Sequence, residues 1–451
     1  MINSVHTMDS LQELINGPIY SAYSYSYPHK TAYRTLDEPV ALNPLWQTEN
    51  LDSLFLYVHV PFCEMRCGFC NLFTLVRPQE SLPDMYLDAL ERQIKALAPT
   101  LSDAQFARYA IGGGTPTYLT ASQLERLFDL TSFNGMANNM PLGIETSPDT
   151  VTADKIRLLQ DRRVNRISMG IQSFTAGEAQ ALARRQSNGQ VFTAIDTIRA
   201  NSSADLNLDL IYGIAGQTIE SWLFSLKQAL TCAPEELYLY PLYVRNETGL
   251  GKVKDKKHIA TDLDDVDMLA LYREGRAFLL SEGYEQVSMR MFRRKGLNTL
   301  DLPTYSCQED GMLGLGAGAR SYTQSVHYSS EYAVGRYGVK DIIEHYVDQS
   351  ETDFLQASYG VKLSLDEQKR RFVMQSLLIS DGLDLSAYQR RFHSNCLTDF
   401  PQLELLINAG LAYQQGNLIL LSVMGFERAD SIGPWFSSDT VKSRMGEYHG
   451  K

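Results

Sequence analysis

The sequence has little cysteine, no long apolar run and no block of five or more basic residues. Six of its 451 residues are cysteine. No apolar stretch approaches the length of a membrane-spanning helix, so we expect no membrane span. The net charge is −12, and the lysines and arginines are scattered. Nucleic acid is therefore not an expected partner.

The first twenty residues, MINSVHTMDSLQELINGPIY, lack both the basic start and the apolar stretch of a secretion signal. We therefore expect a cytoplasmic protein, in which thiols stay reduced. The composition, 44% hydrophobic and 21% charged, is that of a globular protein with a core of ordinary size.

Half of the cysteines lie in one short segment. In HVPFCEMRCGFCNLFT (residues 59–74), the spacing of Cys63, Cys67 and Cys70 is C-x3-C-x2-C. Three unrelated buried thiols are one interpretation, because free cysteine is common in protein cores. Their density, with a glycine between the last two, instead favours metal binding.

Two kinds of metal site are compatible with three clustered thiols. Structural zinc usually has four ligands in two pairs, but Cys232, Cys307 and Cys396 are single and distant, and His59 points along a predicted strand. Thiolates are also the usual ligands of iron–sulfur clusters. A cubane held by three thiolates has one iron without a protein ligand, which can bind a small molecule.

Short apolar runs alternate with helical patterns between residues 54 and 243. This alternation predicts parallel strands joined by right-handed crossovers, and six units favour an incomplete barrel over a flat sheet. The predicted strands are 54–60, 106–113, 140–146, 164–172, 205–213 and 235–243, and the predicted helices are 85–98, 122–130, 152–161, about 175–183, 191–200 and 219–230.

Polar or glycine-rich features recur at the same end of five consecutive predicted strands. They are the cysteines, GGGTPT (112–117), Glu145, Gln172 and Asp209. Barrels of this kind place their chemistry at the carboxyl ends of the strands. This phasing therefore predicts a functional site at that edge of the sheet.

The two ends of the chain differ from this pattern. Residues 1–50 are predicted to be an arm, with the tyrosine-rich stretch 19–34 packed on the barrel surface; a substrate-binding arm is the alternative. The barrel is predicted over 51–350. Residues 351–451 open with an amphipathic helix (363–380) and continue in a helix–helix–helix–hairpin order. This order predicts a small α+β, winged-helix-like domain without a basic recognition helix.

The cysteine spacing, with Phe69 directly before the last cysteine, resembles the signature of the radical S-adenosylmethionine (SAM) enzymes. The resemblance implies a [4Fe–4S] cluster whose open iron chelates the methionine part of SAM. An electron from the cluster then cleaves SAM to a 5′-deoxyadenosyl radical. A fourth thiolate would block the iron that must hold SAM.

Longer stretches narrow the resemblance to the oxygen-independent coproporphyrinogen III oxidase family. They are LYVHVPFCEMRCGFC, IGGGTPT, GIETSPDTVTADKIRLLQDRRVNRISMGIQSF, LNLDLIYGIAGQT and LGLGAGARSY. The resemblance covers about residues 50 to 450 and implies an α/β fold: a partial (β/α)6-type, TIM-like radical SAM barrel. It also implies a tetrapyrrole-like substrate and an electron donor such as flavodoxin or ferredoxin.

The resemblance also implies the residues of the site. The cluster ligands are Cys63, Cys67 and Cys70, and no catalytic residue is assigned. One or two SAM molecules would contact Tyr57, Phe69, Gly113, Gly114, Thr115, Glu145, Gln172, Arg184, Asp209, Tyr243 and Arg320. Taken singly, some of these have plain alternatives: Arg184 as a solvated charge, Asp209 as a turn cap and Glu145 as part of a helix-initiating segment.

The activity implied first is oxidative decarboxylation of a propionate side chain. Two-SAM methyl transfer and haem degradation are alternative reactions, and a haem-binding chaperone is the alternative that is not an enzyme. Two departures keep these alternatives open. Leu72 stands where the oxidases usually carry a fourth cysteine, and SCQEDG (306–311) stands where the chaperones carry Cys-Arg-His-Asn.

Overall fold

The computed structural model describes residues 8–24, 26–133, 135–136, 139–245, 247–257, 263–297 and 305–448. The first seven residues, on which the expectation of no secretion signal partly rests, lie outside this range. Among the described residues, no helix combines the length and the apolar character needed to cross a bilayer.

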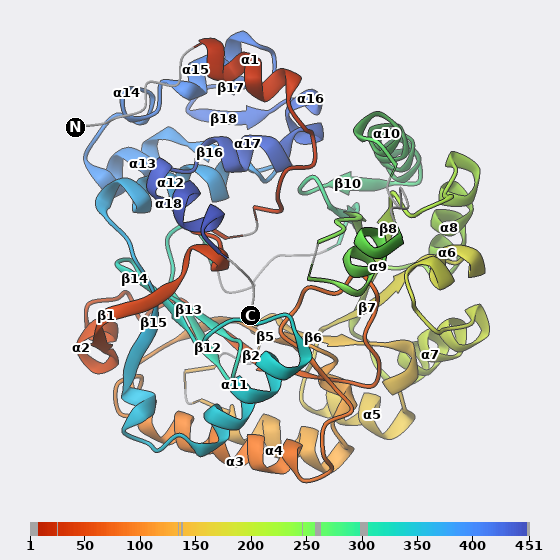
Figure 1. Cartoon of the computed structure of the whole chain (residues 1–451), viewed down its shortest axis with the longest axis vertical. Helices are drawn as coiled ribbons and strands as arrows, with labels where there is room; N and C mark the ends of the chain where they lie inside the picture. The colour runs from red at the N-terminus through yellow and green to blue at the C-terminus, as the bar shows by residue number, and fades with distance from the viewer. Residues whose placement is uncertain are drawn as a thin grey trace.

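Strands of the described chain form one large curved sheet (Figure 1). From edge to edge the order is β1 (Arg34–Ala41), β15 (Gln356–Lys362), β14 (Val326–Ser329), β13 (Arg320–Tyr322), β12 (Met312–Leu315), β2 (Leu54–Val60), β5 (Phe106–Gly113), β6 (Leu142–Thr146), β7 (Arg166–Gln172), β8 (Asp205–Tyr212), β9 (Glu236–Pro241), β11 (Met291–Arg294) and β10 (Tyr284–Gln286). The edge strands β1 and β10 do not pair with each other, so the sheet stays open.

From β12 through β2 to β9, each strand runs parallel to the next one in this order. Helices connect them and cover the convex face: α3 (Leu82–Leu97), α4 (Ala121–Leu130), α5 (Ala153–Asp161), α6 (Ala176–Ala181), α7 (Asn188–Asn201), α8 (Ile219–Thr231) and α10 (Asp265–Ser281). The predicted partial barrel is therefore confirmed. Hydroxyl capping boxes begin α4, α7 and α8, which is why these helices start where they do.

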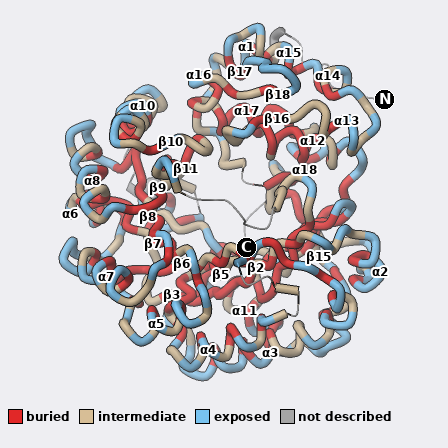
Figure 2. The backbone as a smooth tube through the Cα atoms, turned by 180° about the vertical axis from the view of Figure 1, so that it is seen from behind, coloured by how far each residue is buried: buried red, intermediate tan, exposed pale blue. Residues whose placement is uncertain are grey.

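Side chains alternate between the two faces of each strand, so one face packs in the core and the other faces the concave side of the sheet. In β2, Leu54, Leu56 and Val58 are fully buried against the helices, whereas Phe55 and Tyr57 face the concave side and stay partly exposed. The same alternation places Glu145 and Asp209 on the concave side. Figure 2 shows the buried core following the sheet.

The C-terminal part has an apolar cluster of its own. It contains α12 (Leu365–Leu377), α13 (Leu385–Phe392), α14 (Cys396–Asp399), α15 (Gln402–Asn408), α16 (Val423–Glu427), α17 (Ala429–Trp435), α18 (Asp439–Gly446) and a small sheet of β16 (Leu383–Asp384), β18 (Leu418–Leu421) and β17 (Ala412–Gln415). Strand β15 still belongs to the large sheet, so this separate cluster begins with α12. The domain limits drawn from the sequence stay a prediction.

The N-terminal arm does not lie only on the barrel surface, as the sequence led us to expect. Helix α1 (Met8–Asn16) buries Leu11 and Leu14 in the C-terminal cluster, to which Tyr27 also belongs (Figure 1). Further along the arm, Tyr20 packs edge-on against Tyr212 of β8. The apolar face of α1 matches the C-terminal cluster, and the arm therefore bridges the two parts of the molecule.

The remaining elements are short or lie at the sheet ends. They are α2 (Leu42–Gln47), β3 (Phe62–Cys63), β4 (Leu75–Val76), α9 (Gly249–Lys257), α11 (Arg336–Asp348) and the 3-10 helices η1 (Lys30–Ala32), η2 (Pro116–Tyr118), η3 (Pro148–Thr150) and η4 (Asp353–Leu355).

Candidate active site at the carboxyl edge of the sheet

The cysteine loop leaves the carboxyl end of β2 and is tied to distant parts of the chain. Its first cysteine lies on β3, which pairs with β4. The Gly68 N–H donates to the Leu182 carbonyl at 2.8 Å, and the Gly68 carbonyl accepts from the Leu250 N–H at 2.8 Å. On the other side, the Tyr332 hydroxyl donates to the Asn71 carbonyl at 2.5 Å. The loop is therefore fixed from both sides of the barrel mouth.

Two of the three thiols receive a hydrogen bond from another element. The Thr115 hydroxyl donates to Cys63 Sγ at 3.6 Å, and Arg184 Nη1 donates to Cys67 Sγ at 3.3 Å. Burial nevertheless raises the pKa of Cys63 to about 12, and it also raises the pKa of Cys67, against the opposing effect of Arg184. A metal ion bound to such thiols would favour their thiolate forms.

The loop supplies three thiols as candidate ligands for a metal centre. Among the residues that the structure describes, no three His, Cys, Asp or Glu side chains converge closely enough to hold one metal ion. A [4Fe–4S] cubane would take its three thiolates at separate corners. Of the remaining cysteines, Cys232 caps α8 and Cys396 begins α14, so neither belongs to this loop.

Glycines let β5 end directly beneath the cysteine loop. A Cβ on Gly114 would lie 2.5 Å from the Phe62 carbonyl oxygen and 3.0 Å from Cys63 Sγ. The Gly113 backbone has φ +115°, and a Cβ there would meet the His59 ring at 2.5 Å. The glycine motif is therefore required by the packing of the loop itself, whatever it also does for a ligand.

Glu145 ends β6 and faces the glycine motif. Its Oε2 accepts the Gly113 N–H at 2.9 Å. The side chain lies deep in the molecule yet remains exposed to solvent on the concave side. Desolvation raises the pKa of this carboxyl to about 7, although the bond from Gly113 opposes the rise. A carboxylate in this position can accept hydrogen bonds from a bound amine.

Gln172 and Asp209 lie on the neighbouring strands β7 and β8, and Arg184, in the loop after α6, lies beside Gly170 of β7. Gln172 ends β7 with φ +73°, and the Arg184 guanidinium donates to the Gly170 carbonyl just before it. Asp209 accepts from Asn207 Nδ2 at 2.8 Å, and burial raises its pKa to about 6. Arg184 is thus next to a cysteine and not a solvated charge, and Asp209 lies within β8 and does not cap a turn.

Phe69 and Tyr57 hold the loop from its two flanks. Phe69 packs on the small apolar cluster that contains Leu182 and Ile211. The Tyr57 hydroxyl lies 3.3 Å from His59 Nδ1, and His59 Nε2 lies 3.0 Å from the Phe73 carbonyl. If Nε2 donates to that carbonyl, Nδ1 is left to accept from Tyr57.

His59 is a site residue that the sequence reasoning set aside. It is buried, its pKa is lowered to about 4, mainly by desolvation, and it connects β2 to the far end of the cysteine loop. Its spacing of two residues from Tyr57 was the available signal, because residues i and i+2 of a strand share one face.

Tyr243 and Arg320 lie outside the set around the cysteines. The Tyr243 hydroxyl donates to Asp430 of α17 and accepts from Arg290 Nη2 at 3.1 Å, so it connects the barrel to the C-terminal part. Arg320 begins β13, on the opposite side of β2 from the glycine motif. Their contact with SAM stays a prediction.

Comparison with known proteins agrees with this geometry. Residues 57–229 match the model of the radical SAM superfamily. The oxygen-independent coproporphyrinogen III oxidase of Escherichia coli (strain K12) is 29% identical over 394 residues, 82% of each chain. The heme chaperone HemW of Bacillus subtilis (strain 168) is 28% identical over 340 residues, which cover 72% of this chain and 88% of the relative.

A solved structure extends the match to the fold. The coproporphyrinogen III oxidase (HemN) of Escherichia coli, described as a radical SAM enzyme, superimposes with a TM-score of 0.78 and 26% identity, covering 92% of this chain and 97% of that one. Members of this superfamily carry a [4Fe–4S] cluster and SAM. Residues 57–229 thus form a radical SAM domain, and the chain as a whole is similar in sequence and fold to the oxygen-independent coproporphyrinogen III oxidases and, in sequence, to HemW.

Proposed function

We propose that this protein binds a [4Fe–4S] cluster on Cys63, Cys67 and Cys70 and uses it, with SAM, to abstract hydrogen from a tetrapyrrole-like substrate. The observation that carries the proposal is a three-thiol loop fixed at a polar, partly solvent-exposed sheet edge, with Leu72 where a fourth thiol could follow. When bound, the cluster with its open iron supplies the electron that cleaves SAM to a carbon radical.

The residues of this chain would do the binding and orienting. Arg184 and Thr115 donate to ligand sulfurs and so favour the thiolate forms. Glu145 offers an acceptor for the amino group of SAM, while Asp209 offers one for ribose hydroxyls. Tyr57 and His59 would keep the loop in place.

The favoured reaction is oxidative decarboxylation of a propionate. The 5′-deoxyadenosyl radical would take a hydrogen atom from the carbon β to the carboxylate and become 5′-deoxyadenosine. Loss of CO2, with transfer of one electron to an external one-electron acceptor, would then leave a vinyl group. The names of the oxidase relatives support this reaction, and the name of the HemW relative supports haem binding as the second candidate.

Products separate the candidates. The protein, reconstituted with iron and sulfide without oxygen, is reduced and incubated with SAM and coproporphyrinogen III. Formation of 5′-deoxyadenosine together with CO2 supports decarboxylation. S-adenosylhomocysteine with a methylated product would favour methyl transfer, and tight haem binding without SAM cleavage would favour haem delivery. Zinc without sulfide in the purified protein would contradict the proposal.

A further inference from the structure

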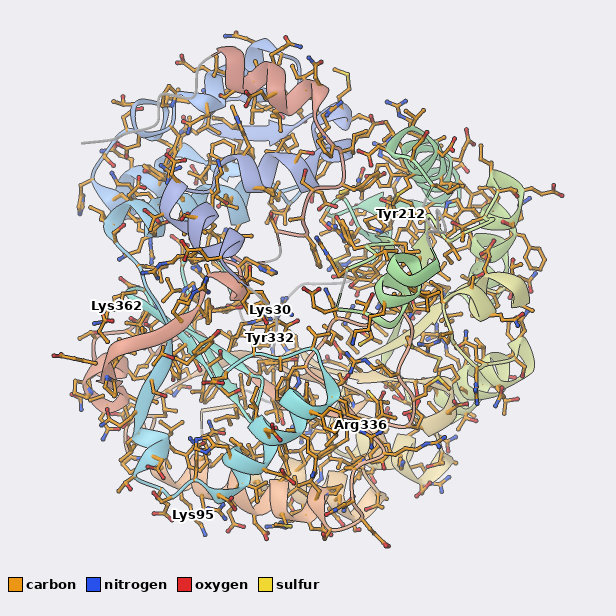
Figure 3. The ribbon with its side chains drawn as sticks, viewed as in Figure 1. Lys30, Lys95, Tyr212, Tyr332, Arg336 and Lys362 are labelled. Atoms are coloured by element: carbon orange, nitrogen blue, oxygen red, sulfur yellow. The ribbon has the colours of Figure 1, made fainter. Side chains whose placement is uncertain are left out.

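A lysine of the N-terminal arm lies at the centre of the molecule. Lys30 begins η1 and is half-buried, with Nζ 3.9 Å from the centroid of the Tyr332 ring. Figure 3 shows Lys30 and Tyr332 side by side in the middle of the view, whereas Lys95 and Lys362 lie at the periphery. The arm therefore delivers a positive charge to the region in front of the sheet.

Within the part of the chain that the structure describes, no carboxylate acts on the charge of Lys30. Its electrostatic neighbours are Arg320, Arg245 and the thiol of Cys70, and among the described residues Lys30 makes no ion pair. Burial and Arg320 together lower the pKa of Lys30 well below its ordinary value. An unpaired ammonium in such surroundings is costly for a folded protein. The folded protein nevertheless places Lys30 here, which indicates that its counter-ion is an anion supplied from outside the chain.

The position of Lys30 is fixed and not the result of a loose side chain. Arg34 Nη1 donates to the Thr31 carbonyl at 2.8 Å and closes η1 against β1. Tyr332, which carries the ammonium on its ring face, donates its hydroxyl to the cysteine loop at Asn71. A ligand held by Lys30 would therefore lie at a defined place beside the loop.

The neighbouring histidine adds no charge at neutral pH. Burial, Lys30 and Arg320 lower the pKa of His29 to about 3, so its imidazole is neutral. The positive charge of the cluster thus comes from Lys30, Arg245 and Arg320. Ammonium and guanidinium groups pair well with carboxylates.

We propose that Lys30 and Arg245, beside Arg320, form a subsite that binds a carboxylate of the substrate. This inference rests on the proposed function and adds to it the group that would orient the substrate. The methionine carboxylate of SAM is the other possible source of this chemistry. We assign the subsite to the substrate because Arg320, the electrostatic neighbour of Lys30, begins β13, whereas the glycine motif and Glu145 lie on β5 and β6.

Competitive acylation tests the subsite directly. Cluster-loaded protein, without oxygen, is treated with limiting acetic anhydride in the presence of coproporphyrin III, of SAM, or of neither, and peptides with Lys30, Lys95 and Lys362 are quantified by mass spectrometry. We expect coproporphyrin III to slow acylation of Lys30 about fivefold or more and to leave Lys95 unchanged. An unchanged rate at Lys30, or protection by SAM alone, would overturn the assignment.

Variants give a second measurement. We expect Lys30→Gln to weaken binding of coproporphyrin III about tenfold or more, and Lys30→Arg to restore most of the affinity, because the charge returns. The matched control is Lys95→Gln, which removes an exposed lysine on α3. The tetramethyl ester of coproporphyrin III, which has no free carboxylate, should bind equally to wild type and Lys30→Gln. Equal affinity of both proteins for coproporphyrin III would refute the subsite.

The two proposals fail in different ways. If coproporphyrin III protects Lys30 of the wild-type protein from acylation but the protein never cleaves SAM, the proposed function is contradicted and the subsite is supported. Protein that cleaves SAM without any protection of Lys30 would support the function and overturn the subsite.

Discussion

Two positive charges at the N-terminal arm differ in how they are neutralised: Arg290, which is buried beneath the arm, and Lys30, a half-buried residue of the arm itself. Arg290 lies over the Tyr23 ring, with 3.8 Å between its guanidinium carbon and the ring centroid, and Nη2 is 2.5 Å from Asp430 Oδ2. The Arg290 and Asp430 side chains are 5% and 2% exposed. Lys30 has an aromatic ring but no carboxylate. The first charge is satisfied within the chain, and the second is available to a ligand.

This difference separates a structural contact from a binding contact. The Arg290–Asp430 pair joins the turn before β11 to α17, so it stabilises the fold without any ligand. In the ligand-free protein the charge of Lys30 has only the face of the Tyr332 ring as a favourable contact. A bound anion would supply the counter-charge. Variants of Arg290 should therefore change stability, whereas variants of Lys30 should change ligand binding.

The largest expected effect is on cofactor loading. Cys67→Ala should abolish incorporation of iron and sulfide and all SAM cleavage, because the third ligand is lost. We expect the unfolding free energy of the metal-free protein to change by only about 1 kcal/mol. Iron and sulfide analysis, absorbance and thermal melts measure the two effects. Cys232→Ala, at the end of α8, is the control and should load normally; wild-type loading in Cys67→Ala would contradict the ligand assignment.

The next effect is on stability. Arg290→Met leaves the Asp430 carboxylate buried without a counter-ion, with the Tyr243 hydroxyl still donating to it, and should lower the free energy of unfolding by about 3–5 kcal/mol. Combining it with Asp430→Leu should recover most of the loss, because no charge then stays buried. Denaturant unfolding of the metal-free protein measures this. Arg290→Met with wild-type stability would show that the pair is not a structural joint.

Lys30→Met should not destabilise the protein as Arg290→Met does. Since the ammonium has no counter-ion, its removal should leave the unfolding free energy of the ligand-free protein unchanged or raise it by about 1 kcal/mol. The same denaturant experiment, compared with Lys95→Met, measures the change. A decrease in the unfolding free energy as large as that of Arg290→Met would mean that Lys30 is paired in the folded protein. Lys30 and Arg290 would then not differ in the way described above.

The smallest effect is a change in pH dependence. The pKa of Glu145 is about 7 in the folded protein and 4.5 ordinarily, so the folded state holds the proton more tightly. Stability should therefore fall as the pH rises from about 4.5 to about 7, and Glu145→Gln should remove this share of the fall. Melting temperatures of metal-free protein across this range test it. Glu125→Gln, which removes a largely exposed carboxylate, should keep the wild-type dependence of melting temperature on pH. The same dependence in Glu145→Gln would contradict the prediction.

Local sequence signals predicted the elements of the barrel well. Strand β2 begins and ends at the predicted residues, because its apolar alternation is uninterrupted. The strand predicted from residue 140 begins instead at Leu142, since Pro141 has no N–H for the ladder. The helix predicted from residue 85 begins at Leu82, where Pro83 is well tolerated in the first turn.

Contacts between distant residues could not be predicted in this way. The Arg290–Asp430 pair spans 140 residues, and the arm meets the C-terminal part across more than 300. No local periodicity carries that information. The same holds for Lys30, which reads as a surface lysine until the fold places it beside Tyr332.

The anchors of the cysteine loop have a consequence for biogenesis. The loop at 63–74 is tied to Leu182, Leu250, Tyr332 and Val334, which the ribosome delivers long after the cysteines have emerged. The nascent chain thus carries three thiols without their scaffold. Assembly factors would meet a finished receptacle only after the translation of most of the barrel, which makes cofactor insertion a late step of maturation.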